Sequence, residues 1–219
     1  FYHSFAGKTV GPAIDLAEHL ISIAPPAADG SSFGKAFFCS SGSEANDTAM
    51  KMVWYYQAAR GKPEKRKIIS RRRGYHGVTM AAASMTALAY AQNGFGLPLD
   101  FVKHTTTPDY YNEGRDGESE AEFTARCAAE LEALIIEEGP ETVGALFAEP
   151  VMGAGGVIVP PAGYFAAIRE VLERHDVLLV ADEVICGFGR TGEMWGSQTM
   201  DVRPDMLTCA KALSSAYLP

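Results

Sequence analysis

Cysteine is scarce in this sequence, and its placement excludes two ways of stabilising a small fold. The chain has 219 residues and four cysteines, Cys39, Cys127, Cys186 and Cys209, and no two of them stand at the short spacings that metal ligands use. Neither a disulfide framework nor a zinc site is therefore expected. We expect free thiols, a reducing compartment such as the cytosol, and no metal.

Long apolar runs and an excess of positive charge are also missing. No run approaches the ~18 consecutive apolar residues of a membrane-spanning helix, and the first residues, FYHSFAGKTV, do not have the pattern of a signal peptide. The formal net charge of −8 disfavours nucleic acids and acidic membranes as partners, because both are polyanions. What remains is an ordinary globular composition, 47% hydrophobic and 21% charged.

Short, nearly continuous apolar runs recur along the chain. Such runs are typical of strands that are buried on both faces, as in a parallel sheet. They occupy residues 35–40, 67–70, 145–151, 177–184 and 206–210.

Helical patterns separate these runs. The pattern at 119–139 opens with a capping box of Ser119 and Glu122 and ends at Gly139. Strands that alternate with helices predict an α/β fold of three layers, with helices on both faces of a mainly parallel sheet. The other two helices are expected over residues 45–60 and 164–175, and the first of these should bury Ala45, Ala49, Met52, Val53 and Tyr56.

Polar, glycine-rich or titratable residues follow every one of the five apolar runs. In open parallel sheets, ligands bind at the carboxyl ends of the strands. We therefore expect one site, assembled from SSGSEAND (40–47), RRRGYHG (71–77), EPVMGAGG (149–156), DEVICGFGRTG (182–192) and Lys211.

The segment SSGSEAND has two interpretations. A helix that starts after small residues presents free N–H groups and a positive dipole end, which suits a phosphate held by Ser41, Gly42 and Ser43. Ser41 and Glu44 also have capping-box spacing, so the segment could be a helix cap alone. In GYHG, Tyr75 could stack on a flat ligand with His76 beside it, or could be a packed loop aromatic.

Three charged residues have similar alternatives. Asp182 follows five apolar residues, so it should be buried, and a buried carboxylate needs a partner: a cation of the fold or a protonated ring nitrogen of a ligand. Glu149 raises the same question one strand away. Lys211 lies in the uncharged stretch MLTCAKALSSAYLP; desolvation would make it a nucleophilic amine, whereas a snorkelling lysine would keep its charge in water.

A phosphate cradle, a stacking aromatic, a buried aspartate and a lysine amine together suit one ligand, pyridoxal 5′-phosphate. The motifs SSGSEAND, GYHG, AEPVMGAGG, LLVADEVICGFGRTGEMWG and PDMLTCAKALSSAYLP, in this order, resemble those of class III pyridoxal-phosphate aminotransferases of fold type I, most closely the omega or amine:pyruvate branch. Many members have glycine where this chain has Ala216.

The resemblance implies a role for each candidate residue. Lys211 would carry the Schiff base and shuttle the proton, and Asp182 would pair with the pyridine nitrogen. The remaining cofactor contacts would be Ser41, Gly42 and Ser43 to the phosphate, Tyr75 and Val184 on opposite faces of the ring, and His76 and Glu149 close by.

The implied activity is transfer of an amino group from an amine or omega-amino acid to a keto acid such as pyruvate, in a homodimer. Decarboxylase or aminomutase chemistry on the same scaffold, or cofactor binding without turnover, would be the alternatives. Since family members are longer, residues 1–219 are expected to form most of the large domain, without the amino-terminal segment and the small domain.

Overall fold

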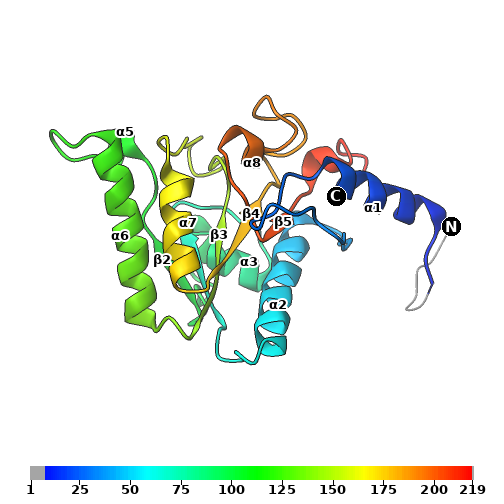
Figure 1. The fold of residues 1–219 in the computed structure, drawn as a ribbon, viewed down its shortest axis with the longest axis horizontal. Coiled ribbons are helices and arrows are strands. Elements are labelled where there is room, and N and C mark those ends of the chain that lie inside the picture. Colours follow the sequence, from blue (N-terminus) through cyan, green and yellow to red (C-terminus); the bar gives the residue numbers. More distant parts are fainter. Residues whose placement is uncertain (1–7, 219) are drawn as a thin grey trace.

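A parallel sheet of five strands forms the centre of the fold. The computed structural model describes residues 8–218. All neighbouring strands are parallel, in the order β2-β1-β3-β4-β5 (Figure 1). The strands are β1 (Lys67–Arg71), β2 (Val102–Thr105), β3 (Val143–Ala148), β4 (Leu178–Asp182) and β5 (Met206–Thr208).

Helices cover both faces of this sheet, which confirms the predicted three-layer α/β fold (Figure 1). The helices are α1 (Gly11–Ile23), α2 (Gly42–Ala59), α3 (Met80–Met85), α4 (Ala89–Gln92), α5 (Tyr110–Glu113), α6 (Glu120–Glu138), α7 (Tyr164–Arg174) and α8 (Gly196–Thr199), and a 3₁₀ turn follows at Lys211–Leu213. None of the helices in residues 8–218 is long and apolar enough to cross a membrane.

Alternate residues of the central strands serve two hydrophobic cores. In β3, Leu146 and Ala148 pack with α6 and α7, whereas Ala145 and Phe147 pack with α2 and α3. All six residues of β3 are buried, which explains why its sequence reads as a continuous apolar run.

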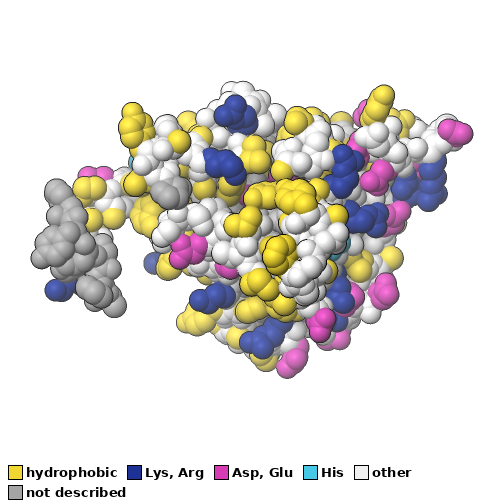
Figure 2. All heavy atoms as spheres, turned by 180° about the vertical axis from the view of Figure 1, so that it is seen from behind, with side chains coloured by type: hydrophobic (Ala, Val, Ile, Leu, Met, Phe, Trp, Pro, Cys, Tyr) yellow, Lys and Arg dark blue, Asp and Glu magenta, His cyan; other side chains and the backbone are white. Residues whose placement is uncertain are grey.

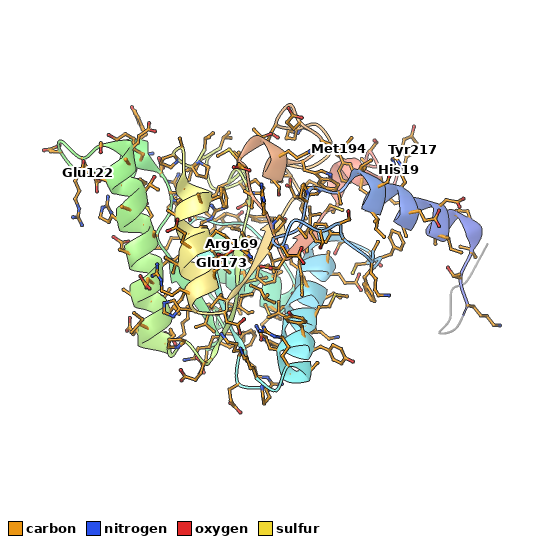
Figure 3. The ribbon with its side chains drawn as sticks, in the orientation of Figure 1. His19, Glu122, Arg169, Glu173, Met194 and Tyr217 are labelled. Carbon is orange, nitrogen blue, oxygen red and sulfur yellow. The ribbon has the colours of Figure 1, made fainter. Side chains whose placement is uncertain are left out.

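Helices α6 and α7 begin and end within one residue of the predicted bounds, whereas α2 begins three residues earlier than predicted. Ser119 caps α6 and Glu122 completes the capping box. On the outer face of α7, Arg169 pairs with Glu173 at 2.8 Å (Figure 3), and Arg169 also pairs with Asp205, just before β5, at 2.8 Å. This second contact ties α7 to the segment that leads into β5.

The buried stripe of α2 differs from the predicted one. Met52 and Tyr56 are exposed, and Ala45 is only half-buried. The helix is rotated so that its polar Asn46 faces the sheet, together with Ala49, Met50, Val53 and Gln57. The prediction failed because it counted apolar residues alone, while two buried positions of this helix are amides.

Two predictions about strands were wrong. Residues 35–40 form no strand, and Phe37 and Phe38 are 67% and 43% exposed. A strand needs a neighbour for its N–H and C=O groups, and within residues 8–218 none pairs with this stretch. Conversely, β2 (Val102–Thr105) was missed because its two middle residues, Lys103 and His104, are polar and only half-buried, so the strand gives no apolar run.

The chain reverses its direction of winding between β1 and β3. From β1 it passes to β2 on one side, and β3 then returns to the other side of β1. In such sheets the crevice at the carboxyl ends of the two strands is the usual place for a ligand. Here the segments after these strands begin at Arg72 and Glu149.

Candidate active site

One cleft at the carboxyl end of the sheet collects every residue that was predicted to form the site. Its volume is about 890 Å³. The predicted residues that line it are Ser41, Gly42, Ser43, Tyr75, His76, Glu149, Asp182, Val184 and Lys211. They come from five separate segments of the chain, so the sheet brings them together as the sequence predicts.

The amino-terminal end of α2 opens into this cleft. Ser41 is the N-cap residue, and its Oγ accepts a hydrogen bond of 3.1 Å from the N–H of Glu44. The capping interpretation is therefore correct, yet the N–H groups of Gly42 and Ser43 still have no carbonyl partner within the helix, because they belong to its first turn. Capping and anion binding are compatible here.

Close backbone approaches shape the walls of the cleft. A Cβ atom on Gly42 would lie 3.0 Å from both methyl groups of Val184. Gly77 has a φ of +132°, and a Cβ there would lie 2.5 Å from Oγ of Ser43. Glycine at position 77 thus allows the loop after β1 to lie directly against the start of α2.

The loop after β1 is fixed by hydrogen bonds at both of its site residues. The N–H of Tyr75 donates to Oε1 of Glu149 at 3.1 Å, and Nδ1 of His76 lies 2.8 Å from Oδ2 of Asp182. Glu149 and His76 are each 2% exposed. Burial raises the pKa of Glu149 above its ordinary value, against the opposing influence of His76.

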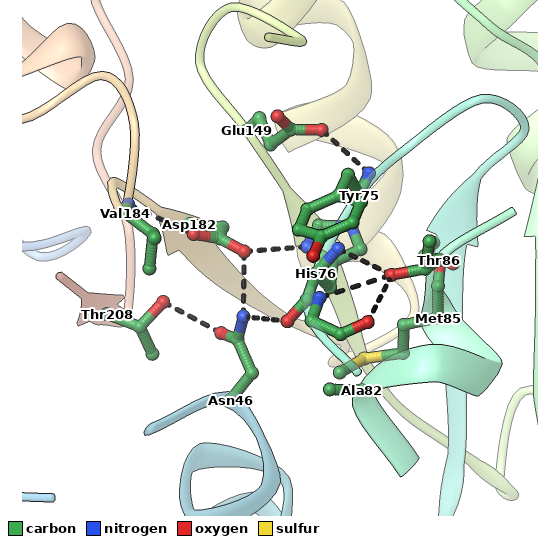
Figure 4. A network of polar contacts seen from close by, with 12 residues as sticks. Asn46, Tyr75, His76, Ala82, Met85, Thr86, Glu149, Asp182, Val184 and Thr208 are labelled. Atoms are coloured by element: carbon green, nitrogen blue, oxygen red, sulfur yellow. Dashed lines mark hydrogen bonds and ion pairs between the residues drawn. The ribbon is translucent and has the colours of Figure 1, made fainter. Parts of the chain in front are cut away.

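Asp182, the last residue of β4, is the most extensively bonded side chain of the site (Figure 4). Its Oδ1 accepts from the N–H of Val184 at 3.0 Å. Its Oδ2 accepts from Nδ2 of Asn46 at 2.8 Å and is the atom that contacts His76. At 2% exposure it is buried, as the sequence predicts.

The structure decides between the two alternatives for the environment of Lys211. It lines the cleft and its side chain is exposed, as the snorkelling alternative predicts. The reason is local: after β5 the chain turns outward, and Lys211 begins a 3₁₀ turn with a φ of +45°. That value is uncommon for a residue other than glycine, and such conformations cluster at functional sites.

Ala216 lies three residues after this 3₁₀ turn, in a backbone conformation that suits the glycine of many family members better than alanine. Its φ is +65°, in the left-handed region, where glycine is favoured.

Burial raises the pKa of the Cys209 thiol, two residues before Lys211, to about 11. A thiol with this pKa stays protonated near neutrality, so Lys211 has no competing thiolate beside it.

Sequence reasoning missed two residues of the site, Asn46 and Thr208. Both lie within motifs that were noticed, but neither received a role. A signal was present: Asn46 stands three and seven residues before the buried Ala49 and Val53, which places an amide on an apolar stripe. Arg190 also lines the cleft, at its exposed side.

A family model described as "Aminotransferase class-III" matches residues 1–219. The chain belongs to the class-III aminotransferases. It is 52% identical to the gamma aminobutyrate transaminase 1 of Solanum lycopersicum and 50% identical to the vanillin aminotransferase of Capsicum frutescens, over 219 residues in each case. These alignments cover 100% of the chain but 42% and 47% of the relatives. The chain thus spans less than half of their length.

Solved transaminase structures share this fold closely. An omega transaminase from Pseudomonas jessenii in complex with PMP has a TM-score of 0.96 and 53% identity, with 100% of this chain and 47% of that chain covered. A structure titled "Transaminase with L-ala" has a TM-score of 0.95 and 57% identity, and the match covers 50% of its chain. They support the prediction of a fold-type I domain.

Class-III aminotransferases use pyridoxal 5′-phosphate, and the residues of the cleft fit it. The unused N–H groups of α2 suit its phosphate, and Lys211 offers an amine in the same cleft. Asp182 offers a buried acceptor to a protonated ring nitrogen. Among residues 8–218 there is no group of three or more His, Cys, Asp or Glu that could hold a metal ion.

Proposed function

We propose that this chain forms the cofactor-binding part of an enzyme that transfers an amino group from an amine or omega-amino acid to a keto acid such as pyruvate. The observation that carries the proposal is the placement of Asp182 at the end of β4 and Lys211 just after β5, on neighbouring parallel strands that share one cleft. Relatives named gamma aminobutyrate transaminase and vanillin aminotransferase support the type of amino donor.

Each side chain has a chemical task in this proposal. When bound, pyridoxal phosphate supplies a carbonyl that condenses with amines and a ring that stores an electron pair. Lys211 would hold the cofactor through its Nζ and would move a proton at that atom. Asp182 would hold the proton of the ring nitrogen in place through its carboxylate. Tyr75 and Val184, which line the same cleft, would pack against the ring.

The phosphate would be held by the start of α2. The N–H groups of Gly42 and Ser43 and the hydroxyl groups of Ser41 and Ser43 are the donors. The hydroxyl of Ser43 already accepts a hydrogen bond from the N–H of Val78 at 3.0 Å, which leaves its own proton free for an anion. His76 and Glu149 would act beside the ring, by holding Asp182 and Tyr75 respectively.

A homodimer is part of the proposal. Apolar side chains are exposed on the side of the sheet that carries α2, α3 and α4, and Figure 2 shows apolar groups between the charges of the molecular surface. The largest exposures there include Phe37 at 67%, Tyr55 at 80%, Met80 at 57%, Tyr90 at 71% and Phe95 at 64%. Exposed apolar area of this kind marks contact surfaces. Light scattering with Tyr55→Glu should report a lower mass than the parent protein.

The cysteines support a reducing compartment, for which we propose the cytosol. All four are free thiols, and burial raises the pKa of Cys127 and Cys186 to about 12. Such thiols are inert and need no disulfide.

The deciding experiment is an absorption spectrum with added pyridoxal phosphate, followed by borohydride reduction and peptide mapping. We expect a visible band and a label on Lys211. Amine and pyruvate are then added, and amino-acceptor consumption identifies transamination. Release of carbon dioxide, or an isomerised amine without acceptor consumption, would instead assign decarboxylase or aminomutase chemistry. A labelled lysine without any turnover would assign cofactor binding alone.

A further inference from the structure

The hydrogen-bond capacity of the Asp182 carboxylate is almost fully used by the protein itself. An ionised carboxylate offers about four acceptor sites, two on each oxygen. Oδ2 is contacted by Asn46 Nδ2 and His76 Nδ1, both at 2.8 Å. Oδ1 accepts from the N–H of Val184. One acceptor site therefore remains, and it belongs to Oδ1.

Asn46 is held so that it presents only a donor to Asp182. Its Nδ2 also donates to the carbonyl oxygen of His76 at 2.7 Å, and its Oδ1 accepts from Oγ1 of Thr208 at 2.8 Å (Figure 4). The reversed amide would direct its oxygen at two acceptors, His76 O and Asp182 Oδ2. The orientation is thus determined by three partners from three elements of the fold.

This arrangement is buried and links the strands that carry Asp182 and Lys211. Asn46 is 1% exposed and Thr208 is 5% exposed. Thr208 ends β5, three residues before Lys211, and Asp182 ends the adjacent strand β4 at the position that pairs with Thr208. A polar group at such depth has no water to replace a lost partner.

We propose that Asn46, oriented by Thr208, is a positioning residue for transamination: it holds the Asp182 carboxylate in one orientation and leaves one Oδ1 acceptor site for the cofactor. This rests on the proposed function. Asn46, His76 and Val184 together fix the direction of the carboxylate. Without the Asn46 donor, Asp182 loses one of these three contacts, and its free Oδ1 site is no longer held toward the cleft.

The hydrogen bonds that run from Thr208 through Asn46 to Asp182 form a relay. Thr208→Val tests this relay without changing any charge. The two side chains have the same shape, but valine leaves Oδ1 of Asn46 buried without a donor and so removes one of the three partners that orient the amide. The titratable groups around Asp182 all remain in place, so a shift in pH dependence reports on the relay. These groups are His76, Glu149, Glu183, Cys186, Cys209 and Lys211.

The measurements use the holoenzyme made from the whole reading frame that encodes this chain. For Thr208→Val we expect full pyridoxal-phosphate content, borohydride labelling of Lys211 and an unchanged KM. We expect kcat to fall about tenfold, the scale of one strained charged hydrogen bond. The pH profiles of kcat and of the bound-cofactor absorption spectrum should also differ from those of the parent enzyme. Thr208→Ser should restore all of these.

Ser70→Ala is the matched control. Ser70 is another buried strand hydroxyl, which donates to the carbonyl of Met85 at 2.8 Å and makes no contact with the relay. It should lower the unfolding midpoint and leave both pH profiles unchanged. Asn46→Asp adds a second carboxylate next to Asp182 and should change both pH profiles further than Thr208→Val.

The outcomes separate the inference from the function on which it rests. A Thr208→Val enzyme that is less stable but keeps the parent pH profiles would assign a structural role and overturn the inference, as would a variant that does not fold. The proposed function would still stand in either case. A parent enzyme that binds no pyridoxal phosphate would overturn both.

Discussion

The N–H of Tyr75 donates to Oε1 of Glu149, and Oε2 of the same carboxylate accepts from the N–H of Gly153 at 3.0 Å. Glu149 thereby joins the segments that follow β1 and β3, on the two sides of the point where the winding of the sheet reverses. Burial raises the pKa of Glu149, so this contact between the two segments should respond to pH.

Glu149→Gln should reveal that response. Because the pKa of Glu149 is higher in the folded than in the unfolded protein, the folded state retains a proton that the unfolded state has released. The stability contributed by this proton is present below the unfolded pKa of about 4.3 and is lost as pH rises through the folded pKa. As pH rises from about 4.3 through the folded pKa of Glu149, the parent protein should therefore lose stability relative to the Glu149→Gln variant.

Urea unfolding at a series of pH values measures this difference. Glu137→Gln, at an exposed position of α6, is the control and should run parallel to the parent. A difference between parent and Glu149→Gln that is constant with pH would contradict the expectation.

The sequence predicted the parts of the fold whose signals are local. Fully buried strands such as β3 give unbroken apolar runs, and the Ser119–Glu122 box that begins α6 is a contact between residues three apart. Strand β2 was not predictable in this way because half of its residues are only half-buried. Residues 35–40 have strand composition but no pairing partner in the described chain, and composition does not report pairing.

The same distinction applies to the site. Asp182 and Lys211 were identified because they stand at or just after the ends of two strands, where the topology of a parallel sheet concentrates ligand contacts. Ser41 was identified because small residues there begin a helix, although the strand expected before it does not form. The role of Asn46 depends on Thr208 and Asp182, which are 162 and 136 residues away along the chain. No local pattern encodes such a contact. The exposure of the Lys211 side chain could not be predicted either, because it depends on the direction in which the chain turns after β5.

Lys211→Ala should abolish turnover. Among the described residues that line the cleft (within 8–218), no other side chain carries an amine that could hold the cofactor carbonyl or move the proton, and the other Lys or Arg side chain there is Arg190. The initial rate of pyruvate consumption with an amine donor measures the loss, and substantial residual transamination would contradict the assignment.

Lys211→Arg is the matched control for charge. A guanidinium stays protonated at all accessible pH values, so it is not a nucleophile. The Lys211→Arg variant should keep the local positive charge and still be inactive. An active arginine variant would show that charge, and not the amine, is what the reaction requires.

Asp182→Asn should lower the rate far more than it weakens cofactor binding. The amide cannot stabilise a protonated ring nitrogen as a carboxylate does, and its NH₂ group would face the N–H of Val184 or the donors from Asn46 and His76. The phosphate contacts at α2 are untouched, so affinity should be retained to within about tenfold. Equilibrium dialysis with pyridoxal phosphate and single-turnover rates separate the two effects. A nearly normal rate would contradict the role of Asp182.

Gly77→Ala should disturb the phosphate end of the cleft. Its Cβ would lie 2.5 Å from Oγ and 2.8 Å from Cα of Ser43, so the loop and the start of α2 must separate. We expect about 2 kcal/mol or more of lost stability and weaker binding of pyridoxal phosphate. Gly117→Ala is the control, because Gly117 also has a positive φ, +77°, but has nothing within 4 Å of the added Cβ. It should lose only about 1 kcal/mol and bind the cofactor normally.

Lys65→Met should destabilise the end of the sheet opposite the cleft. The Nζ atom of Lys65 lies 2.9 to 3.0 Å from four carbonyl oxygens, those of Pro140, Val143, His175 and Asp176, which share its three N–H donors. At 4% exposure this ammonium joins the segments that lead into β3 and β4, and methionine would leave the carbonyl groups without a donor.

The expected loss is about 3 kcal/mol or more, since several charge-assisted hydrogen bonds disappear and buried acceptors stay unpaired. Lys62→Met is the matched control. Lys62 pairs with the side chain of Asp176 at 2.6 Å, but both side chains are more than a third exposed, so its removal should change the free energy of unfolding by less than about 1 kcal/mol. Urea unfolding of the two variants at one pH compares them directly. Equal losses would show that the four carbonyl contacts of Lys65 contribute no more than a surface ion pair.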